Sequence, residues 1–440
     1  MLETQVKLTC APPQKDCEMQ NSTQKIAVLI DRLGSGAGGE ASLLDFVLAL
    51  GSSGHLVHVL VARSSASQRR QLRRLIYAKG LTPGRIRVIP VARTLDFYVA
   101  RSISLEDFVG LDAPRLTAAR FLLLPARQKI KDCLREADII IASQVLSNHG
   151  LRQVKNLAKK AKLVLSHNGD PQTFSEKWER RERFGSDEQQ TQYQQYLGGF
   201  DEILFQSTGQ ELEFRHNYPS IPSRLSTIWP SCDETKCLAA QNSTNPYDSD
   251  TFNFVYVAKF QPTKNQLELI EAFSQITSDF PRTTLTLVGG TISPQDYLDR
   301  CKSFVKQSGL EEKVLFTGHR HDSCRFIFHS DVVIHPSISE GVSRAIREAA
   351  FLGKPIVCSA LTGLHSFLGR SGALYLTNSS ADAIEDALRV SLAEKAMLEE
   401  ISRVAYGAYS NKSEWARFER ACVDLVKRLS ESSIGTGDNL

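Results

Sequence analysis

Two glutamates, Glu340 and Glu348, are separated by seven residues at a point where a β-strand is expected to give way to an α-helix. Residues 331–335 form a short apolar, β-branched run that is typical of a buried strand. Ser343 is a suitable N-cap for the helix, and Gly353 is a suitable stop signal at its end. The pattern therefore places Glu340 in the loop after a strand and Glu348 inside the helix that follows.

These positions suit one kind of ligand. In a parallel sheet, ligands bind beyond the carboxyl ends of the strands and at helix N-termini, where phosphate is favoured. A carboxylate repels phosphate, but it accepts hydrogen bonds from hydroxyl groups. Two glutamates beside such a helix start therefore indicate a ligand with hydroxyls at both ends and phosphate between them. A nucleotide-sugar has this form.

The run from Glu340 to Pro355 resembles the pattern E-G-x-x-x-x-x-x-E-A-x-x-x-G-x-P-V of the group 1 retaining glycosyltransferases of GT-B fold. The resemblance implies that Glu340 contacts hydroxyls of the donor sugar and that Glu348 contacts the ribose of the nucleotide. The other donor-binding candidates in this segment are Gly341, Val342 and Ser343. The alternative is that both glutamates are surface residues of an ordinary α/β helix.

The same family carries the pattern G-R-x-x-x-x-K after a strand, and its basic residues grip the donor diphosphate. Here Lys259 stands at the arginine position and Lys264 at the lysine position, after the expected strand 252–257. Lysine keeps the charge but lacks the planar, bidentate fork of arginine. We therefore expect both lysines to bind the diphosphate with a looser geometry, the alternative being two solvated loop lysines.

A glycine-rich loop lies between the expected first strand, 25–31, and its helix. Gly34, Gly36 and Gly39 match the dinucleotide fingerprint G-x-G-x-x-G in the expected context. The acidic residue expected after the second strand is replaced by Arg63. An NADP-dependent oxidoreductase is therefore an alternative function.

The family resemblance gives this loop another role, because the family also carries glycines before its first helix. It implies that Gly38 and Gly39 form a backbone cradle near the donor diphosphate and the acceptor, since amide groups without side chains can approach an anion. It further implies that His167 lies beside the reacting sugar and that Asp170 lies on the acceptor side. A tight turn of purely structural purpose is the alternative for the glycines.

The segment 63–101 is strongly basic. Residues 68–79 are expected to form a helix with Leu72, Leu75 and Ile76 on one side and arginines on the other. This pattern fits a helix on a membrane surface, or a solvated helix that packs its apolar side on the core. The residues that would meet an anionic membrane are Arg69, Arg70, Arg73, Arg74 and Lys79. We expect no nucleic-acid partner, because no aromatic interleaving or recognised motif accompanies the charges.

Composition bounds the remaining possibilities. The 440 residues predict two domains. The nine cysteines contain no C-x-x-C and are odd in number, which favours reduced thiols in a cytosol. No run reaches the length of a membrane span, and residues 1–24 lack the apolar core of a signal peptide. We expect no metal, because the four histidines of this region fall on three different elements with no carboxylate or cysteine at ligand spacing: His319, His321, His329 and His335. We also expect no cofactor, because a nucleotide-sugar is a substrate.

We therefore expect an α/β protein with two facing Rossmann-like domains, the GT-B fold. Residues 25–230 form the acceptor-side domain, residues 250–410 the nucleotide-sugar domain, and residues 411–430 a helix that crosses back to the first. An irregular linker is expected at 231–250.

The resemblance implies a metal-independent transfer, with retention, from a UDP- or GDP-sugar to a glycan or lipid-linked acceptor in surface polysaccharide or glycolipid synthesis. The expected location is the cytoplasm, with peripheral attachment to the inner face of the cytoplasmic membrane. Two further alternatives are an epimerase of the same fold and a non-catalytic binding protein on a degenerate transferase fold.

Overall fold

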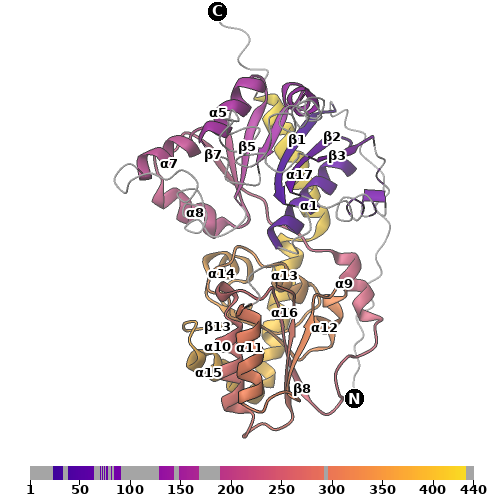
Figure 1. Cartoon of the computed structure of the whole chain (residues 1–440), viewed down its shortest axis with the longest axis vertical. Helices are drawn as coiled ribbons and strands as arrows, with labels where there is room; N and C mark the ends of the chain where they lie inside the picture. The colour runs from indigo at the N-terminus through magenta and orange to yellow at the C-terminus, as the bar shows by residue number, and fades with distance from the viewer. Residues whose placement is uncertain are drawn as a thin grey trace, which may run out of the picture.

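The computed structural model of the protein describes residues 23–32, 38–63, 70, 72, 74, 76–77, 81, 84–90, 128–142, 148–167, 189–291 and 296–432. Figure 1 shows this part of the chain as two α/β units, one above the other. Among the described helices, none combines the length and the apolarity that a bilayer span requires.

The first unit, here called the N-terminal domain, is built on a parallel sheet. Its described strands are β1 (Lys25–Arg32), β2 (Leu56–Arg63), β3 (Ile86–Pro90), β4 (Ile139–Ala142), β5 (Lys162–His167), β6 (Glu202–Phe205) and β7 (Arg224–Thr227). They are arranged in the order β3-β2-β1-β4-β5-β6-β7. The order reverses direction at β1 and β4, which is the topological switch of a doubly wound fold. Alternate residues of β1 enter two different cores, since Ala27 and Leu29 pack on one face while Ile26 and Val28 pack on the other.

The second unit, the C-terminal domain, repeats this plan. Its described strands are β8 (Phe252–Val257), β9 (Thr283–Val288), β10 (Val314–Gly318), β11 (Val332–His335), β12 (Ile356–Ser359) and β13 (Leu374–Leu376). Their order is β10-β9-β8-β11-β12-β13, and all recorded pairings are parallel. The prediction of an α/β protein with two Rossmann-like domains is therefore confirmed.

Helices cover both faces of the sheets. The N-terminal domain carries α1 (Gly38–Ser52), α5 (Asn148–Leu157), α7 (Gln189–Leu197) and α8 (Thr208–Asn217). The remaining helices are α9 (Glu234–Gln241), α10 (Gln266–Ile276), α11 (Asp296–Gln307), α12 (Ser323–His329), α13 (Arg344–Phe351), α14 (Thr362–Leu368), α15 (Ala381–Ala393), α16 (Lys395–Lys412) and α17 (Trp415–Glu431).

The strand–loop–helix–strand unit predicted around the two glutamates is present as β11, α13 and β12. Ser343 occupies the N-cap position of α13, but its side chain makes no capping hydrogen bond. After the helix, Gly353 has φ of 62°, a left-handed conformation that favours glycine and explains the stop.

The expectation of an irregular linker at 231–250 is wrong in one respect, because α9 forms within it. Asp233 caps this helix by accepting a hydrogen bond from the Lys236 amide, and Cys237 and Ala240 are buried. An eight-residue helix with two buried side chains shows little periodicity in sequence, so its packing against α12 and α13 decides its structure.

The C-terminal helix α17 lies against the N-terminal domain, as Figure 1 shows beside α1. Phe418, Cys422, Leu425, Val426 and Leu429 are all buried in the same core as β1 and β2. The ring of Phe418 packs edge-on against Phe46 of α1, with centroids 6.3 Å apart. The end of the chain therefore completes the core of the first domain.

We expect Leu425→Ala to lower the free energy of unfolding of the N-terminal domain by about 2–5 kcal/mol, because it opens a cavity in that core. Urea denaturation measures the change. Leu212→Ala on α8 is the matched control, because its side chain is 64% exposed. Equal stability of the two variants would show that α17 is not part of the domain's core.

Candidate active site

The centre of the site is an ion pair between the two loops that the sequence singled out. Lys264 Nζ lies 2.8 Å from Glu340 Oε2, and it also donates to the Ser339 carbonyl at 3.3 Å. Lys264 follows β8 and Glu340 follows β11, which are neighbours in the sheet. Because parallel strands end at the same edge, residues far apart in sequence meet beyond their carboxyl ends.

His335 supplies the second contact to Glu340. Its Nε2 lies 3.3 Å from Glu340 Oε1, at the last position of β11, and its side chain is 1% exposed. Burial lowers the pKa of His335 although Glu340 opposes this shift, so we treat the imidazole as neutral. On sequence alone, we considered this histidine only as a metal ligand. Its position five residues before Glu340, at a strand end, is the signal for its contact with the carboxylate.

Glu340 is held as a carboxylate. Burial alone would raise its pKa, but the hydrogen bond from His335 and the charge of Lys264 outweigh burial and lower the pKa to about 2. An ionised carboxylate accepts about four hydrogen bonds. With its side chain 21% exposed, Glu340 can accept bonds from a ligand in addition to those from Lys264 and His335.

Tyr256 fixes the geometry of the Lys264–Glu340 pair through hydrogen bonds. Its hydroxyl donates to the Lys264 carbonyl at 2.7 Å and lies 3.0 Å from Ser337 Oγ. Its ring meets that of His335 edge-on at 5.2 Å. Tyr256 was not predicted as a site residue, because a tyrosine in a buried strand has the same sequence pattern as any core residue.

Glu348 lies in α13 with only 5% of its surface exposed. Burial raises its pKa, and the charges of Arg344 and Arg347 on the same helix, together with Lys236 of α9, act against that shift. The positive charges near Glu348 favour its ionised form, although Asp233 acts the other way, and an ionised carboxylate can accept hydrogen bonds from hydroxyls.

Two glycines let the loops approach each other. A Cβ at Gly363 would lie 2.3 Å from the Gly341 carbonyl oxygen, and one at Gly289 would lie 1.8 Å from the Ala258 carbonyl oxygen. Side chains at these positions would push the loop of Glu340 and the end of β8 out of place. Lys259 directly follows this tight contact, and its carbonyl accepts a hydrogen bond from the Gln266 side chain.

The N-terminal domain meets the loop of Glu340 directly. The amide of Val342 donates to Gln206 Oε1 at 3.3 Å. At the start of α8, the Gly209 amide donates to Ser366 Oγ of α14 at 3.0 Å, and Thr208 Oγ1 lies 3.0 Å from the same atom. The two domains are thus in contact next to the ion pair.

The site and surface residues predicted in the N-terminal domain are placed less fully. His167 ends β5 and is fully buried, with Phe205 and Phe214 rings 5.2 and 5.7 Å away. Gly38 and Gly39 form the first turn of α1. The predicted residues Gly34, Gly36, Asp170, Arg69, Arg73 and Lys79 lie outside the described residues.

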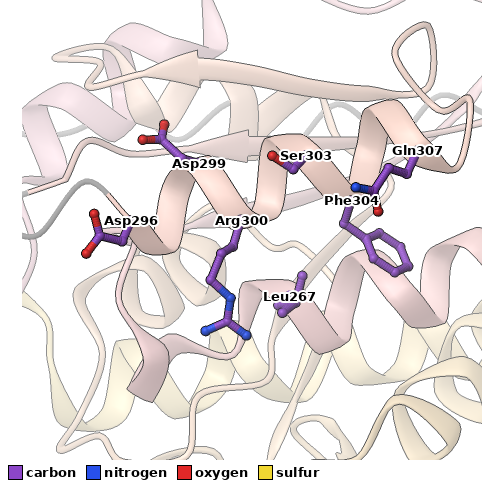
Figure 2. A pocket seen from close by; sticks show the side chains of 7 residues that line it. All are labelled: Leu267, Asp296, Asp299, Arg300, Ser303, Phe304 and Gln307. Atoms are coloured by element: carbon purple, nitrogen blue, oxygen red, sulfur yellow. The ribbon is translucent and has the colours of Figure 1, made fainter.

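A separate surface depression of about 360 Å³ lies between α10 and α11. Figure 2 shows Arg300 and Phe304 pointing from α11 toward Leu267 of α10, with Asp296 and Asp299 nearby. This mixed lining favours no particular ligand class. In the part of the chain that the structure describes, no group of three or more His, Cys, Asp or Glu side chains could hold a metal ion.

The pairing of Glu340 predicts a pH-dependent stability. Its pKa is lowered from 4.5 to about 2, so the stabilisation is complete above pH 4.5 and is lost as the pH falls toward 2. We expect Glu340→Gln to lower the free energy of unfolding at neutral pH by about 1–3 kcal/mol, because Lys264 loses its charged partner. Urea denaturation should show this difference shrinking between pH 4.5 and the lowest pH at which the chain folds. The exposed Glu311→Gln is the control, and a constant difference for Glu340→Gln would contradict the pairing.

Comparison with known proteins connects this geometry to a family. Residues 240–408 match the family described as "Glycosyl transferases group 1". The chain is 29% identical over 150 residues to the UDP-Gal:alpha-D-GlcNAc-diphosphoundecaprenol alpha-1,3-galactosyltransferase of Escherichia coli, covering 32% of this chain and 38% of that protein. It is 31% identical over 140 residues to the trehalose synthase of Thermococcus litoralis, covering 30% and 34%. The matched segment therefore spans only about a third of the length of these relatives.

Solved structures match over almost the whole chain. Anabaena Alr3699/HepE in complex with UDP and glucose aligns with a TM-score of 0.65 and 17% identity, covering 92% of this chain and 99% of that one. Sucrose-phosphate synthase from Thermosynechococcus elongatus gives the same TM-score and identity, covering 93% and 100%. The chain thus has the two-domain GT-B fold, and its residues 240–408 are similar in sequence to the group 1 glycosyl transferases.

Proposed function

We propose that this chain is a retaining glycosyltransferase. It moves a sugar from a UDP- or GDP-sugar to a glycan or lipid-linked acceptor, in the synthesis of a surface polysaccharide or glycolipid. The observation that carries the proposal is the Lys264–Glu340 pair at the carboxyl edge of the C-terminal sheet, followed in α13 by the buried Glu348. The names of similar proteins support it, since one is a galactosyltransferase with a diphosphoundecaprenol-linked acceptor and another was solved with UDP and glucose.

In this proposal, Glu340 and Lys264 act on the two sides of the bond that breaks. Glu340 accepts hydrogen bonds from hydroxyls of the donor sugar. Lys264 has three N–H groups, of which its contacts with Ser339 and Glu340 use two. The third can donate to a diphosphate oxygen and stabilise the negative charge of the leaving group. Lys259 supplies a second positive charge from the same segment after β8.

The proposed chemistry needs no covalent intermediate. Glu340 is a poor nucleophile, because its charge is shared with Lys264 and His335, as its low pKa reflects. The bond from the anomeric carbon to the phosphate oxygen breaks, and the acceptor oxygen bonds to the same face of that carbon. The leaving phosphate takes the proton of the acceptor. Retention follows from attack on the face that the leaving group vacates.

Glu348 and the loop before α13 hold the rest of the donor. The buried carboxylate of Glu348 accepts hydrogen bonds from the ribose hydroxyls, which compensates for its burial. Gly341, Val342 and Ser343 line the path between sugar and ribose. Gly38 and Gly39 remain candidates for binding the donor near its diphosphate, His167 for a contact with the reacting sugar, and Asp170 for the acceptor side.

Attachment to an anionic membrane is a further part of the proposal. Arg70 and Arg74 are exposed, whereas Leu72 and Ile76 are each 2% exposed and belong to the core of the N-terminal domain. The apolar side of this segment therefore packs inward, so attachment would depend on charge and not on insertion of these residues.

A panel of UDP-, GDP- and ADP-sugars should identify the donor by thermal shift. We expect one nucleotide-sugar to raise the melting temperature, and slow hydrolysis of that sugar without acceptor to distinguish an enzyme from a non-catalytic binding protein. NADPH serves as the control for the oxidoreductase alternative. Stabilisation by NADPH and by no nucleotide-sugar would overturn the proposal.

The two glutamates should affect different kinetic constants. Glu340→Gln should lower kcat by about 10²-fold or more, because it weakens a contact that strengthens in the transition state. Glu348→Gln should mainly raise the donor KM, because the ribose contacts are equal in the ground and transition states. Steady-state kinetics measures both constants, with Glu311→Gln as control. Normal turnover of Glu340→Gln would remove Glu340 from the chemistry.

Binding of anionic liposomes tests the membrane proposal. Each basic residue near an anionic surface contributes about 1 kcal/mol, and salt screens the attraction over a Debye length of about 8–10 Å. We expect co-sedimentation that needs anionic lipid and disappears at high salt. An Arg70→Ala, Arg74→Ala variant should bind less while keeping its donor affinity. Wild-type protein that ignores anionic liposomes at low salt would show that this face is only solvated surface.

A further inference from the structure

Two arginines of α13 reach across the boundary between the domains. Arg344 forms an ion pair with Asp45 of α1, and Arg347 Nη2 donates to Ser42 Oγ of α1 at 2.9 Å. The Arg344 and Asp45 side chains are 19% and 12% exposed, and Arg347 as a whole is 1% exposed. These contacts join α1 of the N-terminal domain to the helix that carries Glu348.

Arg347 is buried and Arg344 is partly buried, and both have fewer partners than guanidinium groups need. Among the described residues, Arg347 Nε and Nη1 and Arg344 Nε are buried without a hydrogen-bond partner. Burial, together with the charge of Arg344, lowers the pKa of Arg347 to about 10, so it stays charged at neutral pH. Two positive charges are therefore enclosed between the domains, and each is stabilised by the nearby carboxylates of Asp45 and Glu348.

We propose that Asp45, Arg344 and Arg347 form a charge latch that positions the N-terminal domain against α13. Asp45 is its decisive member, because this N-terminal carboxylate pairs with Arg344 and its charge also acts on Arg347. Glu348 follows Arg347 on the same helix, so the latch also fixes where α1 stands relative to the ribose carboxylate of the proposed donor site. Only that last consequence rests on the proposed function.

Neutral contacts at the same boundary are weaker. Gln206 with the Val342 amide, and Ser366 with Thr208 and Gly209, are hydrogen bonds between uncharged groups. Charge-assisted hydrogen bonds are roughly twice as strong as neutral ones. We call the arrangement with the two domains in contact closed, and an arrangement with the domains separated open. The equilibrium between the two should therefore depend on the latch more than on these neutral contacts.

For a buried ion pair of this kind, removing one partner and replacing the whole group are expected to have different effects. Removing one partner leaves an unpaired buried charge, whereas replacing the whole group by apolar residues of similar volume is often neutral or stabilising. Asp45→Ala should therefore separate the domains, since separation lets water reach the buried guanidinium group of Arg347 and exposes Arg344 further. Replacing both arginines by methionine in the Asp45→Ala background should bring the domains back together.

Small-angle X-ray scattering on the full chain tests this. We expect Asp45→Ala to shift the open–closed equilibrium by roughly 10²-fold toward open, seen as a larger radius of gyration than wild type. The triple variant Asp45→Ala, Arg344→Met, Arg347→Met should return to the wild-type value. Asp279→Ala is the matched control, because the Asp279–Arg389 pair at 2.7 Å lies wholly within the C-terminal domain.

Two results would overturn the latch: a wild-type radius of gyration for Asp45→Ala, or a triple variant as expanded as Asp45→Ala. Circular dichroism must show that each variant is folded. If Asp45→Ala does not fold, Arg344→Glu replaces it, because a carboxylate facing Asp45 from the other domain should open the molecule by repulsion. The scattering needs no substrate, so failure of the latch and failure of the proposed transferase activity are separate outcomes.

Discussion

An ionised carboxylate held between a lysine and a histidine is the interaction on which the C-terminal site depends. Glu340 bonds to Lys264 from the loop after β8 and to His335 at the end of β11. The loop of Lys264 contains only the short 3-10 helix Pro262–Lys264, and the loop of Glu340 has no regular structure. The ion pair joins the two loops, the Tyr256 hydroxyl holds the Lys264 backbone, and the pair keeps Glu340 charged. A group that must accept hydrogen bonds from sugar hydroxyls needs this state.

The two-domain architecture covers the site around this ion pair. A parallel sheet gathers loops at one edge, but it leaves that edge open to water. The second sheet closes the site from the opposite side, through Gln206 and α1, and α17 ties the end of the chain to the first domain. The donor side and the acceptor side thus belong to different cores. The contacts between them can change without unfolding either one.

Much of this was predictable from sequence, for identifiable reasons. Glu340 and Glu348 could be placed because apolar runs, glycine and proline mark the strand, loop and helix around them. Lys264 was identified through its position in the G-R-x-x-x-x-K pattern of the family that the chain resembles. The interdomain contacts were not predictable, because Arg344 and Asp45 are 299 positions apart and nothing local marks their pairing. The helix α9 was missed because its stability comes from packing against α12 and α13 and hardly from its own sequence. His335 was assigned no role because it was considered only as a metal ligand, and its position five residues before Glu340 was not used.

The most direct test of the account is a crystal structure with a nucleoside diphosphate bound. The account predicts the diphosphate against Lys264 Nζ and the ribose hydroxyls on the Glu348 carboxylate, with Glu340 facing the position of the transferred sugar. A nucleotide bound instead along the glycine-rich start of α1, with Lys264 and Glu348 untouched, would contradict it and favour a dinucleotide enzyme.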